Sequence, residues 1–206
     1  MLRVERLKVG SLPPLSFELP PGECLAVEGP SGSGKTRLLR AVADLDPAPG
    51  YVYLDAIERR EMRAPEWRKL VRYVAAEPGW WAETPRGHIP AASAQRFERM
   101  LPSLGLAPGI VDRPVSQLST GERQRLALAR ALCDDARVLL IDEPCASLDQ
   151  QSCALVEEAI RYQILSGRRV ILVSHVEGQI DRLAHSRLQL ARDAGEAKTA
   201  EARPAA

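Results

Sequence analysis

The chain has 206 residues, of which 45% are hydrophobic and 27% charged, and fractions this close to the soluble globular average exclude a disordered or fibrous protein. The 28 Lys and Arg against 27 Asp and Glu leave a net charge of +1, so the field of the whole molecule is too weak to gather nucleic acid or anionic lipid. The longest stretch without a charged side chain, 100–111, is shorter than the roughly 18 residues of a transmembrane helix, and we expect no membrane span.

The first part of the chain predicts short strands joined by turns. Strands are expected at 2–7 and 15–19, where apolar residues alternate, and at two brief apolar runs, 24–28 and 51–54. The apolar residues of 38–45 share one face of a helix. A loop therefore joins the third of these strands directly to a helix.

The middle of the chain differs in composition. After a predicted strand at 70–75, the chain is rich in Pro, Ala and Gly as far as about Leu118, and one helix is plausible at 93–101. We interpret about 79–133 as a small helical subdomain inserted into a single domain that covers 1–190. Beyond it, 191–206 has no apolar periodicity, and we expect a disordered tail.

The last third alternates between helix and strand. Helices are predicted at 120–133 and 150–166, and two continuous apolar runs, 138–141 and 170–173, predict strands that are covered on both faces. Strands that alternate with helices imply a parallel sheet.

The cysteines are Cys24, Cys133, Cys145 and Cys153. They form no CxxC pair, and no His lies at ligand spacing beside them. We therefore expect free thiols in a reducing compartment and no structural zinc.

A glycine-rich segment between a predicted strand and a predicted helix fits G-x-x-x-x-G-K-[ST], which needs this context to bind phosphate. Its members are Gly29, Pro30, Ser31, Gly32, Ser33, Gly34, Lys35 and Thr36. The glycines let backbone N–H groups point at phosphate oxygens, Lys35 reaches the outer phosphates, and the hydroxyl of Thr36 is placed to ligate Mg²⁺. The alternative is a Gly/Ser-rich turn that binds nothing.

Two adjacent carboxylates, Asp142 and Glu143, follow the apolar run 138–141. They lie where a buried parallel strand ends, which is the edge of the sheet that binds ligands. Asp142 would hold Mg²⁺, and Glu143 could orient and deprotonate a water that attacks a terminal phosphate. The alternative is a solvated pair of charges before the turn at Pro144.

Two further groups reach the same region of the predicted fold. The helix from 120 opens with Ser119, Thr120, Gly121 and Glu122, whose hydroxyl and backbone N–H groups suit an anion, although Ser119 and Glu122 also fit a capping box. His175 follows the strand 170–173, where a hydrogen-bonded loop residue is the alternative to a functional one.

The order of these elements, together with Ser147-Leu148-Asp149, resembles the nucleotide-binding subunit of ATP-binding cassette (ABC) transporters, of the short single-cassette bacterial type. The resemblance implies an α/β P-loop NTPase (RecA-like) core with a parallel sheet, an N-terminal antiparallel β subdomain and an inserted helical subdomain. It also implies ATP and Mg²⁺ as ligands, and a head-to-tail dimer that sandwiches ATP. Ser119 and Gly121 would then contact the terminal phosphate in trans, Asp149 would cross the interface, Glu143 would be the base and His175 would sense the terminal phosphate.

The resemblance further implies a separate transmembrane permease subunit as the partner. The chain would form a homodimer, or a heterodimer with a second cassette, on the cytoplasmic face of the cell membrane, without binding nucleic acid. A soluble ABC ATPase of the metal-cluster assembly type is the alternative, and another P-loop enzyme such as a small-molecule kinase is a third reading.

The chain departs from the family pattern at several positions. Ala76 stands where the family has a glutamine, Thr120 and Glu122 replace signature residues, and the aromatic that stacks on adenine is absent between 1 and 15. We expect a working but slow ATPase, with a catalytically dead homologue as the alternative.

Two surface features complete the sequence predictions. Trp80 and Trp81 fall where family members receive a helix of the membrane subunit, or else both rings fill the core of the small subdomain. A solvated face is expected for the basic residues Arg59, Arg60, Arg63, Arg68 and Arg72.

Overall fold

The N-terminal part of the chain forms an antiparallel sheet with the strand order β2-β1-β4-β5. Its strands are β1 (Leu2–Leu7), β2 (Leu15–Leu19), β4 (Tyr51–Leu54) and β5 (Ile57–Glu58). Every second residue of β2 is buried, so this sheet covers a core with one face and meets solvent with the other. The structure is a computed structural model and describes residues 1–176 and 178–191.

A second, five-stranded sheet has the order β6-β7-β8-β3-β9, and all its neighbouring strands pair in parallel. Its strands are β3 (Cys24–Glu28), β6 (Val71–Val74), β7 (Val138–Asp142), β8 (Arg169–Val173) and β9 (Ser186–Gln189). Successive side chains of β7 belong to different core clusters: Val138 and Leu140 to one, Leu139 and Ile141 to the other. The central strands are therefore buried on both faces, which explains their continuous apolar runs.

Helices connect the strands of the parallel sheet. The α-helices are α1 (Lys35–Val42), α2 (Ala64–Leu70), α3 (Ala91–Met100), α4 (Thr120–Leu132), α5 (Gln150–Leu165) and α6 (Gln179–Leu183). Short 3-10 helices lie at Arg59–Glu61, Pro85–His88, Pro102–Leu104, Pro108–Asp112 and Val115–Gln117.

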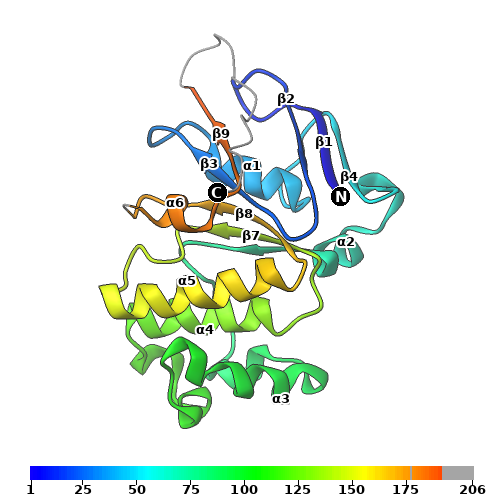
Figure 1. The fold of residues 1–206 in the computed structure, drawn as a ribbon. Coiled ribbons are helices and arrows are strands. Elements are labelled where there is room, and N and C mark those ends of the chain that lie inside the picture. Colours follow the sequence, from blue (N-terminus) through cyan, green and yellow to red (C-terminus); the bar gives the residue numbers. More distant parts are fainter. Residues whose placement is uncertain (177, 192–206) are drawn as a thin grey trace.

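The elements stack in layers on the two faces of the parallel sheet (Figure 1). Helix α1 and the antiparallel sheet share one core cluster with one face of β7, and α4 and α5 share the other cluster with the opposite face. Helix α3 and the green segments around it in the chain lie beyond α4 and α5, at the bottom of the view (Figure 1). The carboxyl ends of the parallel strands therefore stay open between these layers.

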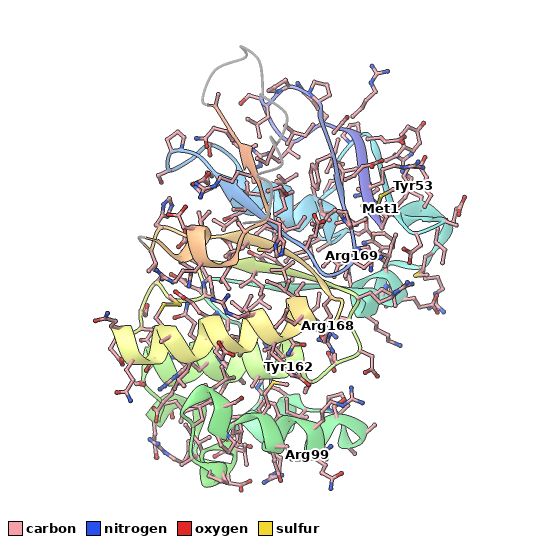
Figure 2. The ribbon with its side chains drawn as sticks, in the orientation of Figure 1. Met1, Tyr53, Arg99, Tyr162, Arg168 and Arg169 are labelled. Atoms are coloured by element: carbon pink, nitrogen blue, oxygen red, sulfur yellow. A yellow bond between two sulfur atoms is a disulfide. The ribbon has the colours of Figure 1, made fainter. Side chains whose placement is uncertain are left out.

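Charged residues join the two sheets at the opposite, amino-terminal edge of the parallel strands. Asp55, in the turn after β4, pairs with Arg169 at 3.0 Å and also with Arg137. Figure 2 shows Arg169 between the parallel sheet and the region of Met1 and Tyr53. These guanidinium groups stabilise the fold. They lie at the opposite end of the strands from the carboxyl edge.

Arg59 corrects the expectation of a uniformly solvated basic face. Its side chain is only 5% exposed, and it donates to the carbonyl oxygens of Ala41 at 2.7 Å and Ala48 at 3.2 Å. Ala41 lies in the last turn of α1 and Ala48 in the segment that follows, so this buried guanidinium joins the end of the helix to the chain after it. Arg60 and Arg63 are exposed, as expected.

The strands predicted from apolar patterns are confirmed, with end residues that differ by one position at most. The predicted helices are also confirmed: the one expected at 93–101 is α3, and those expected at 120–133 and 150–166 end one residue earlier, at Leu132 and Leu165. Elements with few apolar residues were not predicted, namely β5, α2, α6 and β9. The tail expected at 191–206 lies outside the described residues, apart from Ala191.

Candidate functional site

The glycine-rich segment forms the loop between β3 and α1, as predicted. Gly29 has a φ of +147°, and a Cβ there would lie 2.5 Å from the carbonyl oxygen of Leu190. Gly34, at the N-cap of α1, has a φ of +97°. Both positions lie in the backbone region that favours glycine, so the loop has its curled shape because of these residues.

Lys35 lies over this loop with its side chain buried, and its ammonium group donates to the carbonyl oxygens of Gly29 at 2.7 Å and Pro30 at 3.1 Å. Two of its three protons are held by the loop itself. The third remains for a ligand, and α1 adds the positive end of its dipole at the same point. The arrangement suits an anion enclosed by the loop.

Thr36 and Asp142 come together although 106 positions separate them in the chain. The Thr36 hydroxyl donates to Oδ2 of Asp142 at 2.7 Å, and the Asp142 side chain, at the end of β7, is 3% exposed. A hydroxyl and a carboxylate in contact beside a phosphate-binding loop are hard oxygen donors, the set that Mg²⁺ takes together with phosphate oxygens. The residues present therefore fit this ion.

Tyr73, which the sequence reasoning missed, also contacts Asp142. Its hydroxyl donates to the same Oδ2 at 3.0 Å. Burial, followed by the charge of Asp142, raises the pKa of Tyr73 well above its usual value, so the phenol keeps its proton at neutral pH and acts as a donor.

Glu143 has a left-handed backbone with a φ of +49°, uncommon for a residue with a side chain. Its N–H donates to the carbonyl of Val173 at 2.9 Å, and its own carbonyl accepts from Nε2 of Gln124 on α4 at 2.7 Å. These bonds hold the strained backbone from both sides. Strain of this kind is found at functional sites, where the surrounding structure maintains it.

The carboxylate of Glu143 faces His175, at the end of β8. One oxygen accepts from the His175 backbone N–H at 3.1 Å, and the other lies 3.2 Å from Nε2 of the ring. Glu143 and His175, which follow two neighbouring strands, are thus in direct contact, with the imidazole largely exposed and the carboxylate mostly buried.

Two neighbouring cavities collect these groups at the carboxyl edge of the parallel sheet. One, of about 290 Å³, is lined by residues of the loop and by Lys35, Thr36, Asp142 and Glu143. The other, of about 390 Å³, is lined by Gly29, Lys35 and Ser174, and His175 borders both. Ala76 also lines the first cavity, but its methyl group offers no hydrogen bond there.

The predicted signature residues lie elsewhere, on an exposed surface of the same chain. Ser119 and Glu122 form the capping box of α4, with bonds of 2.8 and 3.1 Å, and the Ser119 backbone N–H lowers the pKa of Glu122. Asp149 caps α5 by accepting from the Ser152 N–H at 2.8 Å. A Cβ on Gly121 would lie 3.0 Å from Leu148, so the first turn of α4 adjoins the segment just before Asp149.

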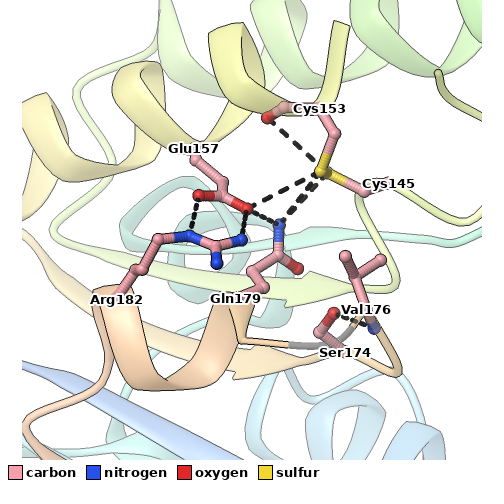
Figure 3. Close-up of polar contacts among 7 residues, drawn as sticks. All are labelled: Cys145, Cys153, Glu157, Ser174, Val176, Gln179 and Arg182. Atoms are coloured by element: carbon pink, nitrogen blue, oxygen red, sulfur yellow. Dashed lines mark hydrogen bonds and ion pairs between the residues drawn. A yellow bond between two sulfur atoms is a disulfide. The ribbon is translucent and has the colours of Figure 1, made fainter. Parts of the chain in front are cut away.

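Cys145 and Cys153 correct the expectation of free thiols, because the structure joins them in a disulfide with a Cα–Cα distance of 5.4 Å. The loop after β7 returns to the first turns of α5, a proximity that their spacing in the sequence does not reveal. Gln179 on α6 donates to Cys145 Sγ at 3.1 Å, and the nearby Glu157 pairs with Arg182 at 2.6 Å (Figure 3).

Cys24 and Cys133 are free and buried, as expected. Desolvation raises the pKa of Cys24 to about 12 and that of Cys133 to about 11, so both remain protonated thiols at neutral pH.

Trp80 and Trp81 lie in different environments. Trp81 is 77% exposed, which excludes it from the core, whereas Trp80 is partly buried and packs against the helical core cluster. The Arg130 guanidinium lies over both rings, at 4.7 Å from Trp80 and 5.3 Å from Trp81, and His88 meets both edge-on. A groove of about 320 Å³ runs beside them, lined by Trp81, His88 and Arg130 among others.

A loop of this shape between a parallel strand and a helix, with Lys35, Thr36 and Asp142 around one cavity, defines a P-loop nucleoside triphosphatase fold. The family model that describes ABC transporters matches residues 12–146. The chain belongs to the ABC transporter family and is a single ATP-binding cassette of it.

The sequences of curated relatives align with most of this chain. It is 36% identical over 180 residues to Protein STAR1 of Oryza sativa subsp. japonica, with 82% of this chain and 52% of that protein covered. It is 35% identical to the cytochrome c biogenesis ATP-binding export protein CcmA of Methylococcus capsulatus, with 78% and 82% covered. The chain thus spans about half the length of STAR1 and most of the length of CcmA.

Solved structures share the fold at 22% identity. A dimeric ATP-binding cassette in a post-hydrolysis state, bound to ADP and Pi, has a TM-score of 0.83 with 98% of both chains covered. An ATP-binding subunit of an ABC transporter has a TM-score of 0.85, with 98% of this chain and 90% of that chain covered.

None of the helices in residues 1–176 and 178–191 combines the length and the apolar character that crossing a membrane requires.

Proposed function

We propose that this chain binds and hydrolyses ATP as the nucleotide-binding subunit of an ABC membrane transporter, and that it dimerises on ATP to move a separate transmembrane subunit. One observation supports this most strongly: Lys35, Thr36, Asp142, Glu143 and His175, from three separate segments, converge on two adjoining cavities. Family membership and relatives that are named as ATP-binding export proteins support the same reading.

The loop would hold the polyphosphate of ATP. Backbone N–H groups of 31–34 would bind phosphate oxygens, and Lys35 would donate its third N–H to the outer phosphates. Thr36 and Asp142 would hold Mg²⁺, which, when bound, neutralises charge on the phosphates. This charge balance is local, as a chain of net charge +1 requires.

Hydrolysis would use the contact between Glu143 and His175. The Glu143 carboxylate would accept a proton from the attacking water, as a positioned general base does. His175 would hold the carboxylate through its backbone N–H, already 3.1 Å away, and its exposed ring would meet the terminal phosphate. The strained backbone of Glu143 keeps the group at the mouth of the cavity.

A second copy, or a second cassette, would complete the site from outside. Ser119, Thr120, Gly121 and Glu122 line neither cavity of their own chain and are presented at the start of α4, beside the loop with Asp149. In a head-to-tail dimer the N–H groups of Thr120 and Gly121, which the capping box does not use, would meet the terminal phosphate of the partner's ATP. ATP would then join the two surfaces through its phosphates, and hydrolysis would separate them.

The groove beside Trp81 is our candidate for the transmembrane partner, which would hold the protein on the cytoplasmic face of the membrane. An exposed tryptophan next to a hollow is the usual centre of a protein interface. The groove reaches β6 through Arg72 and Val74, and β6 leads to Ala76 in the nucleotide cavity, so a docked helix would sit one short segment from the site.

Trp81→Ala tests this surface. We expect the variant to keep its ATPase rate and unfolding temperature in isolation, since the ring is 77% exposed. Its affinity for the membrane subunit should fall about 30-fold, the effect of removing a central interface aromatic. Co-purification from detergent-solubilised membranes measures this, with Leu165→Ala, which is 80% exposed on α5, as the matched control. Undiminished co-purification would remove Trp81 from the interface.

Ala76→Gln tests the departure at the family's glutamine position. Because Ala76 borders the cavity with Asp142 and Glu143, an amide there could bond to the attacking water, and we expect the ATPase rate to rise about tenfold. Phosphate release measures it, and Ala75→Gln, whose position lines the Trp81 groove instead, is the control. An unchanged or lower rate would mean that the alanine at position 76 does not limit the ATPase rate of this chain.

A further inference from the structure

Two hydroxyl groups converge on one oxygen of Asp142. Thr36 donates to Oδ2 from α1 at 2.7 Å, and Tyr73 donates to the same atom from β6 at 3.0 Å. The carboxylate is thereby held between two elements, and its other oxygen, Oδ1, is the one that neither hydroxyl engages. Asp142 itself lines the nucleotide cavity.

The backbone fixes where the phenol of Tyr73 can reach. Strand β6 pairs in parallel with β7, and the register places Tyr73 opposite Leu140, two residues before Asp142. A long side chain can span that diagonal, whereas a shorter one at this position could not. The ring is partly buried against the core cluster of α1 and the antiparallel sheet, which restricts its rotamers.

Thr36 and Tyr73 would play different parts at a metal site. The Thr36 hydroxyl would ligate Mg²⁺ through its oxygen while its proton still bonds to Asp142, so its position would depend on the metal, whereas Tyr73 would orient the same carboxylate oxygen from the protein side alone. The outer partners of a ligating carboxylate commonly decide its orientation and affect metal affinity by 10- to 100-fold. Ala76 has no polar side chain to assist.

We propose that Tyr73 is a positioning residue for the metal site, which turns Asp142 so that Oδ1 faces the divalent cation of the nucleotide complex. The proposal rests on the proposed function. It assigns to this chain a support for the metal that comes from β6, the strand beside Asp142, instead of from Ala76 in the segment after β6.

Tyr73→Phe removes only the hydroxyl and tests the proposal. The probe is Mn²⁺, whose free fraction is measured by electron paramagnetic resonance with the purified full chain in excess over ATP, so that little free ATP is left to bind the metal. We expect the Mn²⁺ dissociation constant to rise about tenfold. Nucleotide affinity in EDTA, where the metal contributes nothing, should be unchanged.

The matched control is Tyr162→Phe, on the exposed side of α5 (Figure 2). It should leave both measurements as in the wild type. A second comparison uses Asp142→Asn: if Tyr73 acts through this carboxylate, then adding Tyr73→Phe to Asp142→Asn should cause no further loss of Mn²⁺ affinity.

The outcomes separate the two proposals. Equal Mn²⁺ affinity in Tyr73→Phe and the wild type would overturn the role of Tyr73 while leaving ATP binding intact. A variant that weakens nucleotide binding equally in EDTA would assign Tyr73 to structure alone, and would also overturn the proposal. A wild-type chain that binds no nucleotide with or without Mn²⁺ would contradict the proposed function itself.

Discussion

Replacing Glu143 with Gln is expected to lower the ATPase rate by about two to four orders of magnitude, the contribution of a general base. Gln has the same shape and still offers an oxygen to the His175 backbone N–H, so the local structure should persist. It cannot accept a proton from water. ATP binding should therefore survive, because the groups proposed to hold the phosphates belong to the loop, Lys35 and Thr36.

A second effect should accompany the loss of turnover. If two chains close around ATP and separate on hydrolysis, the Glu143→Gln protein should accumulate as an ATP-bound dimer. Phosphate release gives the rate, and light scattering after size-exclusion chromatography gives the mass. Glu158→Gln on α5, where the carboxylate is 76% exposed, is the control and should behave as the wild type. Unchanged turnover in Glu143→Gln would exclude this residue as the base.

Replacing Lys35 with Ala should weaken ATP binding by about 10- to 100-fold. Hydrogen bonds to charged groups contribute about 1.5–3 kcal/mol each, and the ammonium is held by Gly29 and Pro30 at the place where the outer phosphates would lie. AMP, which lacks those phosphates, should compete equally well for the variant and the wild type.

Displacement of a fluorescent ATP analogue measures the change. Lys69→Ala, at an exposed position of α2, removes an equal charge from the surface and should have no effect. If Lys35→Ala binds ATP as tightly as the wild type, the loop does not grip phosphate as we infer.

Apolar patterns predicted the elements that carry many buried residues. Strands β3, β7 and β8 are almost wholly apolar, and α4 and α5 present long apolar faces, so their positions followed from periodicity. Helix α2 offers no such signal, because Trp67 is its one buried residue. Strand β9 gives a similarly weak signal, because Leu188 is its one buried residue and its pairing with β3 holds it in the sheet.

The same limit explains which site residues were missed. Lys35, Asp142, Glu143 and His175 belong to local motifs or strand ends, so the parallel sheet that the sequence predicts already brings them to one edge. Tyr73 and Gln124 act across strands and helices, through contacts with Asp142 and with the Glu143 carbonyl. Side chains of this kind carry no motif, and only the three-dimensional packing identifies them.

The sequence did not predict the disulfide between Cys145 and Cys153, for a related reason. Its partners are eight positions apart, on a loop and on the helix that follows it. Whether two such thiols meet depends on how the loop after Pro144 folds back, and the spacing of the cysteines favoured free thiols.

The most direct measurement of the central claim is titration calorimetry of the full chain with ATP at millimolar Mg²⁺. We expect saturable heat at a stoichiometry of one nucleotide per chain, lost when ATP is replaced by adenosine. A flat titration under these conditions would contradict the account, since a loop that encloses no triphosphate could support neither hydrolysis nor the closing of a dimer.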